Sequence, residues 1–352
     1  METKLQAITR IAQERPEEHF TSLAHILNKD FLKECFDELG RNRAPGIDGV
    51  TWAKYEKNLD QNLDELVNRM RSKKYIPEPV KRIYIPKDDG TKRGLGLPTI
   101  EDKIVQMGIK KILEAIYEEE FLEQSYGFRP GRNAHNALEK VWKTIMLHPV
   151  NWVADIDIEK FFDTIDHKQM MEFLQKRIND PNFLRLIGRF LKAGIMEEGV
   201  VIESDKGTPQ GGVVSPILAN IYLHYTLDDW FQNEFRKQSK GYAGLIRYAD
   251  DFIACFEYET DAQAFKAELE KRLNANGLRT SREKSKVIEF GRWAWKRWKS
   301  GGKKPGTFDF LGFTHTGGVS RNGKFKVERR TSSKRYRKKL KAMSTWLGFV
   351  WD

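Results

Sequence analysis

The stretch LIRYADDFIACF, from Leu245 to Phe256, places two acidic residues between two apolar segments. The β-branched, aromatic and other apolar side chains on either side predict two strands that meet at Asp250 and Asp251. Asp is also common in plain surface turns, because its carboxylate accepts hydrogen bonds from nearby backbone amides. This stretch alone supports a surface turn and a metal-binding hairpin tip about equally, so residues elsewhere in the chain have to decide between them.

A second acidic segment lies in VNWVADIDIEKFF, residues 150–162, where Asp155 and Asp157 interrupt a short apolar run. Residues two apart in a strand share a face, so these two carboxylates are expected on the same side of a sheet. If this strand lies beside the hairpin that carries Asp250, the carboxylates converge in one cleft. Converging carboxylates recruit cations, and oxygen ligands favour Mg²⁺ or Mn²⁺. Two such ions held about 3.5–4 Å apart support nucleotidyl transfer.

The neighbouring segments predict how these strands are arranged. The acidic segments are surrounded by a helical stretch at 167–193, a Gly-rich loop at 207–212, a helix at 261–275 and a strand at 286–290. This order describes an α+β fold in which helices cover one face of an antiparallel sheet. The other face is then expected to be open and to hold a substrate.

The composition is that of a folded globular chain. Of its 352 residues, 39% are hydrophobic and 32% are charged, which suffices for two or three packed subdomains. Cys35 and Cys255 are far apart in sequence, so neither a disulfide framework nor a cysteine-based zinc site is expected, in keeping with a reducing, cytoplasmic setting. No segment resembles a signal peptide or a membrane span, so no membrane partner is expected. The sequence leaves the oligomeric state open.

The net charge of +11 is concentrated toward the C-terminus. Residues 292–341 contain 17 Lys and Arg against two acids, whereas the rest of the chain has 44 bases against 48 acids. In this segment cations alternate with tryptophans, and the residues expected to contact nucleic acid are Arg292, Trp293, Trp295, Arg297 and Trp298. This mixture suits phosphate pairing and base stacking. Nucleic acid is therefore the favoured partner, ahead of an anionic membrane surface.

Seven ordered segments carry a resemblance to a known family. They are GIDGVT, IPKDDGTKRGLGLP, SYGFRPGR, ADIDIEKFFDTIDH, GTPQGGVVSPILANIYLH, RYADDFIACF and FDFLGF. Together they resemble a bacterial group II intron-encoded reverse transcriptase of the maturase type. The resemblance implies a right-hand polymerase fold with fingers and palm, and RNA-directed DNA polymerase activity with two Mg²⁺ ions (Mn²⁺ as a substitute). It also implies an RNA template, a DNA primer or target and dNTPs as partners, and binding of group II intron RNA for splicing and retrohoming.

The resemblance implies roles for individual residues. Asp157, Asp250 and Asp251 match the catalytic, metal-binding aspartates, Ile158 supplies a backbone carbonyl to the metal, and Asp155 is a supporting acid. The matches to dNTP-binding residues are Lys87 and Arg93 for the triphosphate, Phe162 as a steric gate against the ribose 2′-hydroxyl, Gln210 beneath the base pair, and Lys284 near the leaving pyrophosphate. The primer–template contacts include Leu311 and Gly312 as the primer grip, and Tyr248. Taken singly, the cations also fit solvated surface charges, and Phe162 also fits a core aromatic.

The resemblance divides the chain into an N-terminal helical extension (1–40), fingers (41–150), palm (151–315, interleaved with the fingers) and the start of a basic thumb (316–352). Two features depart from the family pattern: Gly94 follows Arg93 where the family has Pro, and only the first helix of the thumb is expected. Two alternatives remain open. One is a domesticated reverse transcriptase in phage defence, CRISPR spacer acquisition or diversity generation. The other is an RNA-binding splicing cofactor that needs no polymerase activity.

Overall fold

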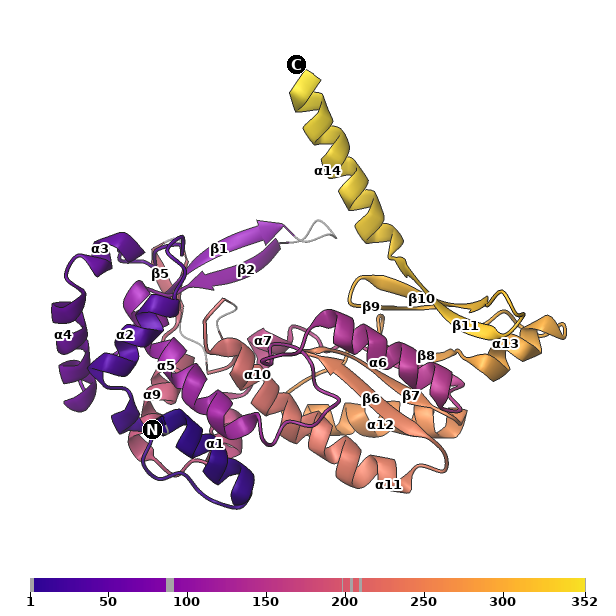
Figure 1. Ribbon diagram of the computed structural model, residues 1–352, viewed down its shortest axis with the longest axis horizontal. Helices are drawn as coiled ribbons and strands as arrows, with labels where there is room; N and C mark the ends of the chain where they lie inside the picture. The colour runs from indigo at the N-terminus through magenta and orange to yellow at the C-terminus, as the bar shows by residue number, and fades with distance from the viewer. Residues whose placement is uncertain (1–2, 87–91, 198, 203–204, 209–210, 352) are drawn as a thin grey trace. The chain divides into compact units, whose positions relative to one another are not determined.

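The computed structural model describes residues 3–86, 92–197, 199–202, 205–208 and 211–351. The chain folds into two compact units, each of which mixes helices and strands (Figure 1), and this confirms the α+β prediction. Unit 1 comprises residues 1–85, 92–121 and 160–224, and unit 2 comprises residues 86–91, 122–159 and 225–352. Lys87 and Gln210, which the sequence analysis singled out, lie outside the described residues.

Unit 1 is mainly helical and packs around α5 (Ile100–Tyr117), whose side chains are mostly buried. Thr99 begins this helix by accepting a hydrogen bond from the backbone N–H of Asp102. A small sheet runs in the order β2-β1-β4-β5. The remaining elements are α1 (Lys4–Glu14), η1 (Ala24–Ile26), α2 (Lys29–Glu38), α3 (Trp52–Glu56), α4 (Leu59–Arg71), β1 (Val80–Pro86), β2 (Lys92–Leu97), α7 (Phe161–Thr164), α8 (His167–Gln175), α9 (Pro181–Lys192), β4 (Ile195–Glu197), β5 (Val200–Ile202) and α10 (Ser215–Leu223).

The single helical stretch expected at 167–193 is two helices, α8 and α9. Asp180 separates them, because its carboxylate accepts hydrogen bonds from the backbone N–H groups of Asn182 and Phe183 and so begins α9. A proline occupies the first position of α9, where its missing N–H has no cost. Asp180 followed by Pro181 is therefore a local sequence signal of this boundary.

Unit 2 is built on an antiparallel sheet in the order β6-β7-β3-β8. Its strands are β3 (Trp152–Ile156), β6 (Ala243–Tyr248), β7 (Asp251–Phe256) and β8 (Lys286–Glu289). The predicted hairpin of strand, acidic turn and strand is confirmed by β6 and β7. The remaining elements are α6 (Ala134–Leu147), η2 (His224–Asp228), η3 (Phe231–Phe235), α11 (Arg236–Gln238), α12 (Glu259–Ala275), α13 (Arg292–Lys299), β9 (Phe308–Phe310), β10 (Phe313–Val319), β11 (Phe325–Thr331) and α14 (Ser333–Trp351).

Both faces of the β6-β7-β3-β8 sheet are covered, which corrects the expectation of one open face. On one face, Phe235 of η3 and Phe265 of α12 lie with ring centroids 6.1 and 5.3 Å from that of Phe256. On the other face, side chains of α6 and of the β11-β10-β9 sheet join a common core with Ile253 and Cys255. The apolar residues of β7 alternate toward both faces, so each face needs its own cover.

His315 of β10 lies inside this second core. It is 1% exposed, and its ring stacks on that of Phe308 with centroids 4.6 Å apart. Burial, together with the nearby charge of Arg329, lowers the pKa of His315 to about 4. The unfolded chain binds this proton near pH 6.5. As the pH falls from about 6.5 to about 4, the unfolded state therefore gains a proton that the folded state lacks, and the folded state loses stability.

We expect His315→Phe to remove this part of the acid sensitivity. Between pH 7 and pH 5 the wild-type chain should lose about 2 kcal/mol of its free energy of unfolding through this residue, and the variant should not. Urea unfolding of both proteins at the two pH values measures the difference, because the other titratable groups are common to both. Equal shifts of the two unfolding midpoints would contradict the assignment.

The two cysteines are free and buried, as the sequence indicates. Burial raises the pKa of Cys35 and of Cys255 to about 12, so both thiols stay protonated and pack as small apolar side chains. Within the described part of the chain, no helix combines the length and the apolar character that a bilayer crossing requires.

Candidate active site

Acids from two distant parts of the chain meet at one end of the unit 2 sheet. In the antiparallel register of β3 and β7, Ile156 lies opposite Phe252. Asp157 follows Ile156 and Asp251 precedes Phe252, so their side chains leave the sheet on the same face. Asp155, two residues before Asp157, shares that face. The shared face predicted for Asp155 and Asp157 agrees with this register.

Asp250 occupies the turn of the β6–β7 hairpin. Tyr248 pairs with Asp251, which leaves Ala249 and Asp250 as the connecting residues. Ala249 has a φ of 57°, a left-handed conformation that residues with a side chain rarely adopt. Gly127 packs against this turn, since a Cβ atom added there would lie 2.3 Å from the backbone nitrogen of Ala249. The turn that carries Asp250 is therefore strained and closely packed.

Burial and neighbouring carboxylates raise the pKa of two of the acids, Asp155 and Asp251. Desolvation, followed by the charges of Asp155, Asp250 and Asp157, raises the pKa of Asp251 to about 7. Desolvation, followed by the charges of Asp157 and Asp309, raises the pKa of Asp155 to about 6. Asp251 still keeps solvent-exposed surface, so an ion from solvent can reach it. A cation at this position would relieve the repulsion and favour the ionised forms.

The donor set fits a hard divalent cation. Asp155, Asp157, Asp250 and Asp251 offer carboxylate oxygens, the ligands that Mg²⁺ and Mn²⁺ prefer. After burial, the charges of neighbouring carboxylates contribute to the raised pKa values of Asp155 and Asp251. Among the residues described here, no three acidic, His or Cys side chains are arranged as ligands of a single ion.

Asp157 is held through its backbone and contacted by a cation. Its carbonyl accepts a hydrogen bond from Ser281 N–H at 2.8 Å, and its N–H donates to Ser285 Oγ at 3.3 Å. Lys284 Nζ lies 3.4 Å from Asp157 Oδ2, and both side chains are well exposed, so this ion pair adds little to stability. Ile158 forms an isolated antiparallel bridge with the same segment. Lys284 thus lies beside the acids, and its role toward pyrophosphate stays a prediction.

The turn at Leu311 and Gly312 also reaches the acids. The backbone N–H of Leu311 lies 3.4 Å from Asp251 Oδ2. Both turn residues have left-handed φ angles, 52° and 81°. Arg335 Nη1 donates to the Leu311 carbonyl at 3.2 Å, and a Cβ atom at Gly312 would lie 2.2 Å from the same nitrogen. The segment that resembles a primer grip therefore adjoins Asp251, and its contact with a primer stays a prediction.

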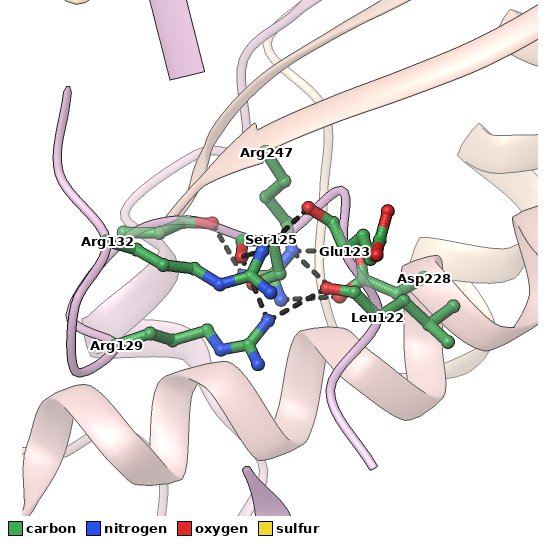
Figure 2. Close-up of polar contacts among 8 residues, drawn as sticks. Leu122, Glu123, Ser125, Arg129, Arg132, Asp228 and Arg247 are labelled. Carbon is green, nitrogen blue, oxygen red and sulfur yellow. Dashed lines mark hydrogen bonds and ion pairs between the residues drawn. The ribbon is translucent and has the colours of Figure 1, made fainter. Parts of the chain in front are cut away.

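Arg247 and Asp228 are residues near the hairpin to which the sequence analysis gave no role. Both side chains are fully buried. Arg247 Nε donates to the two carboxylate oxygens of Asp228 at 2.9 and 3.0 Å (Figure 2). Arg247 Nη1 donates to the carbonyl of Ala249, in the turn, at 3.0 Å. The available signal is a cation inside an apolar strand, which requires a buried partner, but no pattern in the sequence identifies Asp228 as that partner.

A loop at residues 122–132 holds the same strand through its backbone. The N–H and the C=O of Arg247 each pair with this loop, at 2.8 Å. Figure 2 shows Arg129 and Arg132 beside one another. Both side chains donate hydrogen bonds to backbone carbonyls of the same loop. Part of this loop is the SYGFRPGR segment, so its arginines serve the structure of the loop that supports the hairpin.

Arg93 and Phe162 lie in unit 1. Arg93 is exposed in β2. Phe162 is half-buried in α7 and meets Phe161 edge to face, with ring centroids 5.3 Å apart. Its carbonyl accepts a hydrogen bond from Thr208 N–H at 2.7 Å, so Thr208 packs against this residue. The roles of Arg93 and Phe162 toward a dNTP stay predictions.

The basic, tryptophan-rich segment forms α13. Trp293 is 48% exposed, and Lys296 Nζ lies 4.4 Å from its ring centroid. Trp295 packs against the core of unit 2, and Arg297 forms an ion pair with Glu289. The helix therefore presents some of its residues to solvent and uses others within the fold.

Curated relatives of this chain include proteins encoded in introns. The group II intron-encoded protein LtrA of Lactococcus lactis subsp. cremoris is 36% identical over 222 residues, which cover 62% of this chain and 37% of LtrA. Protein YkfC of Escherichia coli K12 is 32% identical over 277 residues, which cover 69% of this chain and 72% of YkfC. An uncharacterized 91 kDa protein in the cob intron of Schizosaccharomyces pombe is 37% identical over 212 residues, 25% of its length. The chain thus spans little more than a third of LtrA.

The family described as reverse transcriptase (RNA-dependent DNA polymerase) matches residues 85–315. This range includes β3, the β6–β7 hairpin and the Leu311–Gly312 turn, which are the elements that meet at the end of the sheet. Because the match covers more than half of the chain and takes in every acid gathered there, the protein belongs to the reverse transcriptase family.

Proposed function

We propose that this chain is an RNA-directed DNA polymerase that adds dNTPs to the 3′-hydroxyl of a primer. The observation that carries the proposal is the gathering of Asp157, Asp250 and Asp251 at one end of the unit 2 sheet. A plain surface turn needs no second acidic strand on the same face, and its carboxylates are not desolvated beside other carboxylates as Asp155 and Asp251 are. Membership of the reverse transcriptase family is the second support.

In this proposal the three aspartates would hold two Mg²⁺ ions, for which Mn²⁺ could substitute. The Ile158 carbonyl would be a further oxygen ligand, and Asp155 a supporting acid. When bound, the ions activate the primer hydroxyl and neutralise charge on the phosphates. The contribution of the chain itself is to keep these oxygens at fixed positions while substrates come and go. The raised pKa values of Asp155 and Asp251 support the proposal, because they mark a site that favours a cation.

The proposed dNTP contacts combine charge and shape. Lys87 and Arg93 would bind the triphosphate, because charge-assisted hydrogen bonds to phosphate suit Lys and Arg. Phe162 would exclude a ribose 2′-hydroxyl, and Gln210 would lie beneath the base pair. The position of Lys284, 3.4 Å from the Asp157 carboxylate, supports a role near the leaving pyrophosphate.

We assign the palm to 151–315, the fingers to 41–150, interleaved with the palm, and the start of the thumb to 316–352. The antiparallel sheet with its acids at one end supports the palm assignment. In the proposed palm, Tyr248, Leu311 and Gly312 would contact the primer terminus, and the closeness of Leu311 to Asp251 supports this role.

Helix α13 is the proposed template contact outside the active site. The neighbouring cations and rings could bind phosphates and stack on bases together. Lys299 Nζ lies 4.9 Å from the ring centroid of Trp298 and 5.3 Å from that of Trp295, so a second cation of this helix lies over tryptophan rings. Deleting everything after Lys299 would be a poor test, because Phe308 and Phe310 belong to the core of unit 2. Charge removal on the helix surface avoids that problem.

We expect Lys296→Ala/Lys299→Ala to weaken template binding and to reduce its salt dependence. Each lost phosphate contact removes about 0.7–0.9 from the slope of log affinity against log salt, so the slope should fall by about 1.5. Fluorescence anisotropy with an RNA–DNA primer–template at several salt concentrations measures this. Lys54→Ala/Lys57→Ala is the matched control for the loss of two charges, because Lys54 is exposed on α3 and Lys57 is exposed at its C-cap. An unchanged slope in the α13 variant would exclude this helix as a contact.

By its resemblance to intron-encoded relatives, we further propose that the chain binds group II intron RNA, and that splicing and retrohoming are its biological setting. The domesticated roles and the splicing cofactor without polymerase activity are the alternatives. Intact acids at the sheet end favour an active polymerase over the cofactor, because a protein relieved of catalysis has no need of a repelling acidic cluster.

A primer-extension assay tests the proposal. With poly(A)/oligo(dT), Mg²⁺ and dTTP the protein should extend the primer, and with UTP or with a chelator it should not. Failure to extend on any RNA template in Mg²⁺ or Mn²⁺, by protein that still binds the primer–template, would overturn the proposed function.

A further inference from the structure

We infer that Arg247 and Asp228 form a positioning pair, which sets the place of the turn that carries Asp250. The inference rests on the proposed polymerase function and adds a device that fixes the metal-binding turn. Neither residue belongs to the acidic cluster, and no role in the resemblance falls on either of them.

The pair lies on the far side of the hairpin from the acids. Arg247 pairs with Phe252 in the hairpin, whereas Tyr248 pairs with Asp251. Neighbouring residues of a strand point to opposite faces, so the Arg247 side chain leaves the face opposite to that of Asp251. Both members of the pair are fully buried. Arg247 therefore acts on the site through the backbone, without touching substrate or cation.

The guanidinium of Arg247 connects the Asp228 carboxylate with the backbone carbonyl of Ala249 in the turn. Its Nε donates to both carboxylate oxygens of Asp228, at 2.9 and 3.0 Å, and its Nη1 donates to the Ala249 carbonyl at 3.0 Å. The donors of a guanidinium are held in one rigid plane, so the position of the turn is tied to the position of Asp228. This tether acts on the residue with the left-handed φ, next to Asp250.

Asp228 is itself held in place. It is the last residue of η2, a π-helical segment, and such segments shift backbone carbonyls out of the regular helix pattern. Arg272 of α12 takes up the shifted carbonyls, donating to Thr226 O at 2.6 Å and to Tyr225 O at 3.2 Å. The chain of contacts therefore runs from α12 through η2 and Arg247 to the turn.

Stability alone does not explain such a pair. Buried ion pairs are often replaceable by apolar side chains of similar size without loss of stability, because desolvation offsets the attraction between the charges. An apolar replacement, however, cannot donate a hydrogen bond to the Ala249 carbonyl. A positioning role and a purely structural role therefore predict different behaviour for the same double variant.

The experiment compares wild type, Arg247→Met and Arg247→Met/Asp228→Leu. The single variant leaves an unpaired buried carboxylate and should be clearly less stable than wild type, whereas the double variant should recover a midpoint of urea unfolding close to that of wild type. In the double variant we expect kcat for primer extension to fall about 10- to 100-fold, with KM for dNTP nearly unchanged. The Mg²⁺ concentration for half-maximal rate should rise.

A second readout does not depend on activity. Hydrogen exchange of the 248–251 backbone, measured by mass spectrometry, should be faster in the double variant, while exchange in α12 and β3 stays at wild-type level. Wild-type extension kinetics together with wild-type exchange at 248–251, in a stable double variant, would overturn the inference. Where the double variant does not fold, Arg247→Lys takes its place, since one ammonium keeps the charge but not the planar fork.

The two proposals can fail separately. If wild-type protein does not extend a primer, the proposed function fails, and the exchange measurement still decides whether Arg247 and Asp228 set the turn. If wild type is active and the double variant matches it in both readouts, the positioning inference alone fails.

Discussion

Asp250→Asn should abolish primer extension on poly(A)/oligo(dT), a loss of about 10³-fold or more, while affinity for the primer–template stays close to that of wild type. The amide has the size of the carboxylate but lacks the charge that a divalent cation needs. The substitution also removes one of the charges that raise the pKa of Asp251, so that pKa should move toward its ordinary value. Steady-state extension with Mg²⁺, and anisotropy for binding, measure the two effects.

Asp37→Asn is the matched control, because Asp37 is exposed on α2 in unit 1 and the change has the same chemistry. It should extend at the wild-type rate. Extension by Asp250→Asn within about threefold of wild type would refute a metal-binding role for Asp250.

Gly127→Ala should impair the site without touching any acid. A Cβ atom at this position would lie 2.3 Å from the nitrogen of Ala249 and 2.9 Å from the carbonyl carbon of Tyr248, both of which are backbone atoms. Since no flexible side chain can yield, the turn must shift, and we expect a loss of about 1–3 kcal/mol in the free energy of unfolding. The shift of Asp250 should lower the extension rate about 100-fold, as displacements near 1 Å commonly do. Urea unfolding and extension kinetics are the two measurements.

Gly131→Ala is the control for Gly127→Ala. It replaces a glycine of the same loop by alanine but creates no contact with the turn. Gly131 has a φ of 69°, but nothing lies within 4 Å of an added Cβ atom. It should cost about 1–2 kcal/mol through backbone strain and leave extension nearly unchanged. Gly127→Ala with the extension rate of Gly131→Ala would show that the packing against Ala249 does not position the turn.

The local patterns of the sequence are enough to predict the acidic hairpin and β3. Alternating and apolar residues around Asp250 and Asp251 indicate two strands, and the spacing of Asp155 and Asp157 indicates their common face. These predictions succeed because strand formation and side-chain direction depend on residues close together in sequence.

The predictions that fail depend on contacts between distant residues. The break between α8 and α9 is marked locally by Asp180 and Pro181. The hydrogen bonds that the Asp180 carboxylate accepts from the backbone N–H groups of Leu23 and Ala24, at 2.7 and 2.8 Å, instead join segments far apart in sequence. The pairing of Arg247 with Asp228 has the same character. The expectation of an open sheet face also failed for this reason. The segments that cover this face, α6 and β9, lie far before and far after the β6–β7 hairpin in sequence.

The central claim is that β3 and the β6–β7 turn bind the same divalent ions. The most direct test replaces Mg²⁺ by Fe²⁺ in the primer–template complex and uses ascorbate and peroxide to cut the backbone near the bound iron, with the cuts mapped by mass spectrometry. The account predicts cuts near Asp157 and near Asp250 in the same sample, both suppressed by excess Mg²⁺ and both lost in Asp157→Asn. Cuts at only one of these segments, or at neither, would contradict it.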